Sequence, residues 1–124
     1  MNNKQIGGII IDAGHGGIDS GAVGNNLLEK DLTLKVSQYM QKRFQELGIP
    51  SKMTREGDEY LPKNERVKKV LSLYNNQPNI LLISNHINAG GRDGCYCKLI
   101  NLIFFISTIW IMNSIIFIFK CMSI

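Results

Sequence analysis

The chain has 124 residues, a formal net charge of +4 and three cysteines, all of which lie within residues 95–124. This length allows one domain, and residues 1–94 contain no cysteine with which to build a disulfide framework. The modest positive charge lacks the dense basic stripe with interleaved aromatic residues that a nucleic-acid-binding surface requires, which excludes nucleic acid as the expected partner. No signal peptide is expected, because the apolar run at residues 9–11 is too short for the core of one.

A β-branched apolar run over residues 7–12 predicts a buried first strand. A glycine-rich loop is expected to follow it over residues 14–26. This loop does not complete the G-x-G-x-x-G or G-x-x-x-x-G-K-S/T patterns, so phosphate binding is the weaker interpretation. The glycines instead favour a close approach of the backbone to a metal or a substrate.

The first helix is expected over residues 29–47, where apolar side chains recur every three or four positions. Asn26 and Glu29 have the three-residue spacing of a capping pair at its start. Gly48 and Pro50 are typical of a helix end. The glycine-rich loop therefore leads directly into a long amphipathic helix.

The remaining elements complete an alternating pattern. A short strand is expected over residues 51–54, a second helix from Pro62, and a third strand over residues 80–84. The order strand, helix, strand, helix, strand predicts an α/β fold with a mostly parallel sheet and helices on both faces, truncated after the third core strand. Right-handed crossovers would bring the C-terminal ends of these strands to one edge of the sheet.

The two histidines of the chain each follow an expected strand. His15 comes after the first strand and His86 after the third, so both should lie at the same sheet edge, where open α/β sheets bind ligands. A catalytic zinc takes three protein ligands and leaves one position for water. Glu29 is the best third ligand, because the helix it opens starts at that edge. Asp12 and Asp19 are the alternatives.

Other roles for these residues remain open at this point. Each histidine could instead be a hydrogen-bonded residue at the end of a strand, and Glu29 could be only a capping residue. Asp12 could orient His15 through the second ring nitrogen rather than bind the metal itself.

Several motifs occur together over about residues 5–94. They are Asp12–Gly17, Gly21–Gly24, Glu29–Leu32, Thr54–Arg55 with Asp58, Arg66 and Ser84–Ala89. In this order they resemble the zinc-dependent N-acetylmuramoyl-L-alanine amidases of the phage endolysin and autolysin type. The resemblance implies that His15, Glu29 and His86 bind zinc. Asp12, Arg66 and Asn88 are candidates for supporting these ligands or contacting substrate.

The resemblance also implies an activity: zinc-activated water cleaves the amide between N-acetylmuramic acid and L-alanine in bacterial peptidoglycan. In the family a second glutamate, beyond the H-x-N-A motif, acts as general base, and no acidic residue follows Asp93 here. The catalytic base is therefore unassigned beyond Gly94, and a weakly active or inactive copy is expected. Such a protein would be cytoplasmic until its release to the cell wall.

Residues 95–124 differ from the rest of the chain. Their only charges are Lys98 and Lys120, and they lack all five amino acids whose codons begin with G. We hypothesise a frameshift that cut short an amidase catalytic domain over residues 1–94. The alternative is a membrane anchor, since the uncharged run Leu99–Phe119 would span roughly 30 Å as a helix, about one bilayer core. The chain would then be a non-catalytic membrane-associated or wall-binding remnant.

Overall fold

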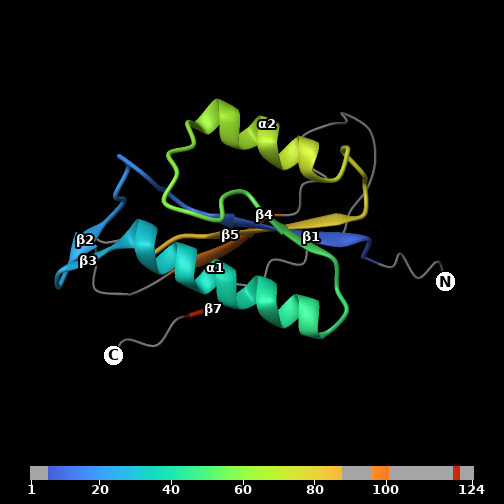
Figure 1. The fold of residues 1–124 in the computed structure, drawn as a ribbon, viewed down its shortest axis with the longest axis horizontal. Coiled ribbons are helices and arrows are strands. Elements are labelled where there is room, and N and C mark those ends of the chain that lie inside the picture. Colours follow the sequence, from blue (N-terminus) through green and yellow to red (C-terminus); the bar gives the residue numbers. More distant parts are fainter. Residues whose placement is uncertain (1–5, 88–95, 101–118, 121–124) are drawn as a thin grey trace.

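The structure is a computed structural model that describes residues 6–87 and, by backbone alone, residues 96–100 and 119–120. A sheet lies between two helices, and a small hairpin projects at one end (Figure 1). The α/β class predicted from the sequence is confirmed.

Three parallel strands form the centre of the sheet: β4 (Ser51–Met53), β1 (Gly8–Ala13) and β5 (Ile80–Asn85), in that spatial order. Ile11 in β1 pairs with Met53 on one side and with Ile83 on the other. All six residues of β1 are buried, as expected for an apolar strand with neighbours on both sides and helices on both faces.

The two helices cover opposite faces of the sheet. Alternate residues of a strand point to opposite faces, so each face has its own apolar cluster. Helix α1 (Glu29–Glu46) lies over the face formed by Ile9, Ile11 and Ile83. Helix α2 (Lys63–Leu73) packs Val70 against the face formed by Ile10, Ile80 and Leu82. The predicted placement of helices on both faces is confirmed.

A hairpin that the sequence did not predict lies within the glycine-rich region. Strands β2 (Val23–Gly24) and β3 (Leu27–Leu28) pair antiparallel through a two-residue turn. Asn25 and Asn26 form this turn with φ angles of 48° and 59°, a conformation that asparagine tolerates and that tight hairpins require.

The start of α1 also differs from the prediction. The helix begins at Glu29, its N-cap residue is Leu28, and no side-chain capping bond is formed there. The expected capping pair of Asn26 and Glu29 is therefore wrong: Asn26 belongs to the hairpin turn, and Glu29 makes contacts elsewhere.

The sheet continues past its three parallel strands, which the sequence did not predict. Strand β6 (Tyr96–Ile100) pairs antiparallel with β5, and β7 (Phe119–Lys120) pairs antiparallel with β6. Most of the run Leu99–Phe119, from residue 101 to 118, lies outside the described residues. Within the described ranges, neither helix is long and apolar enough to cross a bilayer.

Candidate metal centre

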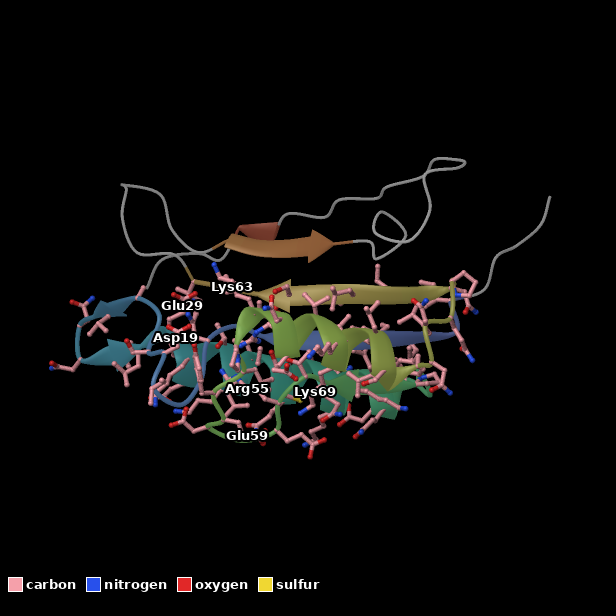
Figure 2. All side chains as sticks on the ribbon, turned by 90° about the horizontal axis from the view of Figure 1, so that it is seen from above. Asp19, Glu29, Arg55, Glu59, Lys63 and Lys69 are labelled. Carbon is pink, nitrogen blue, oxygen red and sulfur yellow. The ribbon has the colours of Figure 1, made fainter. Side chains whose placement is uncertain are left out.

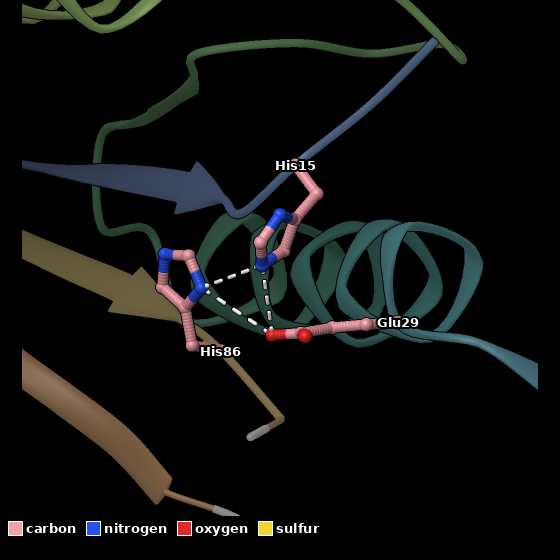
Figure 3. Close-up of side chains that lie close together, drawn as sticks. All are labelled: His15, Glu29 and His86. Carbon is pink, nitrogen blue, oxygen red and sulfur yellow. Dashed lines mark hydrogen bonds and ion pairs between the residues drawn. The ribbon is translucent and has the colours of Figure 1, made fainter. Parts of the chain in front are cut away.

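His15 and His86 meet at the C-terminal edge of the parallel sheet. Ala13 is paired with Asn85 at the ends of β1 and β5, so the residues just beyond them emerge side by side. Nε2 of His15 lies 3.2 Å from Nδ1 of His86, and the rings meet edge to face with centroids 4.9 Å apart (Figure 3). The parallel topology thus brings together two residues 71 positions apart in sequence.

Glu29 completes a group of three from the first position of α1. Its Oε1 lies 3.1 Å from Nε2 of His15 and 3.3 Å from Nδ1 of His86 (Figure 3). Ligand atoms held 2.0–2.1 Å from a tetrahedral zinc lie roughly 3.3 Å from one another. The spacing and the donor set of two imidazoles and one carboxylate therefore fit a three-ligand metal centre.

The carboxylate of Glu29 is held by backbone donors as well as by the histidines. The N–H of Ala22 donates to Oε2 at 2.8 Å, and the N–H of Ile87 donates to Oε1 at 2.6 Å. Burial raises the pKa of Glu29, but these two donors and the neighbouring histidines outweigh it and lower the pKa overall. The side chain is therefore an ionised carboxylate, the form that binds a metal.

Asp19 contacts the far side of the His15 ring rather than the group of three. Its Oδ2 lies 3.0 Å from Nδ1 of His15, and its Oδ1 accepts the N–H of Gly21 at 3.1 Å. The hydrogen bond from His15, followed by that from Gly21, lowers the pKa of Asp19. With the proton on Nδ1, the Nε2 lone pair of His15 faces Glu29 and His86. Asp19, predicted as an alternative ligand, therefore lies outside the group of three and contacts one of its members.

Asp12 does not contact the His15 ring, where Asp19 lies instead, so the alternative in which Asp12 orients that ring is wrong. Its carboxylate accepts hydrogen bonds from Thr54 and Ser84, both at 2.7 Å, and from Arg66 at 2.6 Å. Burial raises the pKa of Asp12, but Arg66 and then the two hydroxyl donors lower it overall. Arg66 also donates to the backbone carbonyl of His15 at 2.9 Å. Arg66, a candidate for supporting the ligands, thus pairs with a buried carboxylate and holds the backbone of His15.

Arg55 has a structural role that the residue pattern alone did not indicate. Its side chain is 1% exposed and donates to the carbonyls of Ala13, Gly14 and Lys30. These bonds tie the end of β1 to the first turn of α1. A buried arginine gives no signal in composition or periodicity, because arginine is usually exposed; only the family motif marked this position.

A second link holds the glycine-rich loop to α1. Asp58 accepts hydrogen bonds from the N–H of Gly17 at 2.7 Å and from Nζ of Lys30 at 2.6 Å. The loop that carries His15 is therefore held by Asp58 as well as by Arg55 and Arg66. Asp19 and Glu29 lie at this same end of the sheet, beside the hairpin of β2 and β3 (Figure 2).

Two glycines allow the close approaches that this site needs. A Cβ on Gly14 would lie 2.5 Å from Cε1 of His86, and one on Gly21 would lie 2.6 Å from Cδ2 of His15 and 2.8 Å from Oε2 of Glu29. Gly21 also has a φ of 62°. The predicted role of these glycines in letting backbone pass close to the site is thus supported by the geometry.

Two predictions fall outside the described residues. Asn88, a candidate for substrate contact, is one, and the region beyond Gly94 where the resemblance places the general base has no described side chains.

Comparison with known proteins finds similarity to one family of enzymes. A family model described as N-acetylmuramoyl-L-alanine amidase, Amidase_3, matches residues 9–97. The chain is 42% identical over 91 residues to the germination-specific N-acetylmuramoyl-L-alanine amidase of Bacillus subtilis, and 45% identical over 82 residues to the uncharacterized protein YqiI of that organism. These matches cover 65% and 66% of this chain, which spans only 38% of the length of either relative.

Solved structures agree in fold. The CwlD amidase from Clostridioides difficile, determined in complex with the GerS lipoprotein, is 32% identical with a TM-score of 0.58. That match covers 71% of this chain and 51% of the other. The catalytic domain of the amidase CwlV from Bacillus (Paenibacillus) polymyxa is 31% identical, also with a TM-score of 0.58, over 67% of this chain and 46% of that one.

Proposed function

The chain belongs to the N-acetylmuramoyl-L-alanine amidase family, and we propose that it binds zinc through His15, Glu29 and His86. The observation that carries this proposal is the convergence of three donor atoms, 3.1, 3.2 and 3.3 Å apart, from the residues just beyond β1 and β5 and from the first residue of α1. Two imidazoles and one carboxylate leave one position of a tetrahedral zinc for water or substrate, the arrangement of catalytic rather than structural sites.

We further propose that this centre serves hydrolysis of the amide between N-acetylmuramic acid and L-alanine in bacterial peptidoglycan, and that the chain acts at the cell wall. A bound zinc would lower the pKa of its water towards about 7 and polarise the scissile carbonyl. The protein's part is to present an ionised Glu29 and two aligned imidazoles at an edge of the sheet where both histidines are partly exposed. This partial exposure leaves the site open to a polymeric substrate.

The test compares zinc content and peptide release in the same preparations. Wild-type protein is dialysed against trace zinc, its metal is measured by mass spectrometry, and new L-alanine amino termini are counted after incubation with purified peptidoglycan. Glu29→Gln should lose both properties, because a neutral amide is a poor zinc ligand. Glu46→Gln, at the exposed end of the same helix, is the matched control and should retain both.

The outcomes separate the two functions considered. Zinc retention with zinc-dependent release supports the amidase. Zinc retention without release favours a non-catalytic remnant of the family. A wild-type protein that never retains zinc contradicts the proposal.

A further inference from the structure

Asp19 lies against a proposed zinc ligand on the side away from the metal. Its Oδ2 is 3.0 Å from Nδ1 of His15, the ring nitrogen opposite the one that faces Glu29. This contact depends on a tight turn: the backbone groups of Gly16 and Asp19 exchange two hydrogen bonds, of 2.9 and 3.0 Å. His15 itself has a φ of 61°, an unusual conformation for a residue other than glycine. The chain therefore folds back so that one carboxylate meets the imidazole.

The other oxygen of Asp19 extends the contact towards a second ligand. Oδ1 accepts the N–H of Gly21 at 3.1 Å, and the N–H of the next residue, Ala22, donates to Oε2 of Glu29 at 2.8 Å. One side chain thus fixes the ring of His15 and anchors the segment that holds Glu29.

We propose that Asp19 is a positioning residue for zinc: it selects the His15 tautomer with its proton on Nδ1 and thereby keeps the Nε2 lone pair directed at the metal. This inference rests on the proposed zinc function and concerns a residue that does not itself bind the ion. A neutral imidazole exchanges its proton between two nitrogens, so an acceptor on one nitrogen favours metal binding at the other and makes it more basic.

A merely structural role for Asp19 would be to hold the glycine-rich loop. Asp58 provides the matched comparison, because it holds the same loop at the N–H of Gly17 and at Lys30 but touches none of the three proposed ligands. If loop geometry alone matters, loss of either carboxylate should affect zinc binding alike. If the tautomer matters, only loss of Asp19 should.

The experiment measures zinc dissociation constants by competition with a chromophoric chelator. Removal of a carboxylate behind a ligand histidine weakens metal binding by about 10-fold to 100-fold, which is expected for Asp19→Ala. Asp19→Asn should lose less zinc affinity than Asp19→Ala, because the asparagine amide oxygen still accepts the Nδ1 proton of His15. The zinc affinity of Asp58→Ala should match that of the wild type. Circular dichroism of the zinc-free proteins checks folding, and Asp19→Asn carries the test if Asp19→Ala does not fold.

A second readout follows the tautomer directly. Nitrogen-15 chemical shifts of the zinc-free protein at neutral pH should show the Nδ1–H form of His15 in wild type and in Asp58→Ala, but a mixture of both forms in Asp19→Ala. Equal zinc affinity in wild type and Asp19→Ala, or an equal loss in Asp58→Ala, overturns the role of Asp19 while leaving the zinc site standing. Failure of the wild type to bind zinc overturns both.

Discussion

Arg66 and Asp12 form an ion pair with 2.6 Å between Nη1 and Oδ1, and Asp12 is only 6% exposed. The same guanidinium donates to the carbonyls of Ala13 and His15. A residue of α2 therefore neutralises a charge buried at the end of β1 and at the same time holds the turn that carries a proposed metal ligand. Stability and metal binding should be coupled through this pair.

Replacement of Arg66 by methionine keeps much of the aliphatic stem but leaves the Asp12 carboxylate without its ion-pair partner. Breaking a buried pair by removing one member costs about 3 kcal/mol or more, and partial exposure of Arg66 favours the lower end. Lys68→Met is the control, because its pair with Glu65 is exposed and should contribute about 0.5 kcal/mol or less. Urea unfolding measures the free energy of unfolding of both variants. Equal losses of this free energy in Arg66→Met and Lys68→Met would contradict the prediction.

The same pair predicts a pH dependence of stability. Because the pKa of Asp12 is lower in the folded than in the unfolded chain, its contribution is present above the unfolded value, near 3.8, and is lost as the pH falls through the folded value. Asp12→Asn should therefore destabilise the protein most above about pH 4. The difference in unfolding free energy from wild type should shrink on acidification below that value. A difference that is constant from pH 3 to pH 7 would contradict the prediction.

The fold was largely predictable because its signals are local. The apolar runs at residues 7–12 and 80–84 indicate buried strands, and the spacing in residues 29–47 indicates a helix. Parallel topology then places His15 and His86 at one edge without any knowledge of side-chain contacts. Three elements of the prediction (two strands and a helix) were thus sufficient to find the group of three.

The predictions that failed concern side chains whose partners come from distant segments of the chain. Asn26 and Glu29 match a capping pair in spacing, but Glu29 turns to His15 and to two backbone N–H groups instead. Asp12 and Asp19 both lie near His15 in sequence, and only the tertiary approach of Arg66 and the tight turn decide which of them meets the ring. Spacing alone does not contain this information.

Gly14 offers a test of the close packing around His86. A methyl group there would lie 2.5 Å from Cε1 of His86 and 2.6 Å from the carbonyl oxygen of Asn85, so Gly14→Ala must displace one of them. Overpacking of this kind costs about 1–3 kcal/mol, and displacement of His86 should weaken zinc binding as well. Gly24→Ala is the control, because nothing lies within 4 Å of its added Cβ. Thermal unfolding and zinc titration should distinguish the two variants. Equal losses of stability and of zinc affinity in both would contradict the prediction that the contact of the added methyl group with His86 or Asn85 causes the effect.

Zinc itself should stabilise the folded chain, because the three donors converge only when β1, α1 and β5 are assembled. At a free zinc concentration 100 times the dissociation constant, the free energy of unfolding should rise by about 2.7 kcal/mol, and a chelator should reverse the change. His86→Ala should unfold at the same temperature with and without zinc. Magnesium is the control ion: it prefers oxygen ligands in octahedral geometry, so a site with two imidazole nitrogens should not respond to it. Stabilisation by magnesium as large as that by zinc, or by zinc in His86→Ala as large as in wild type, would place the binding elsewhere than at this centre.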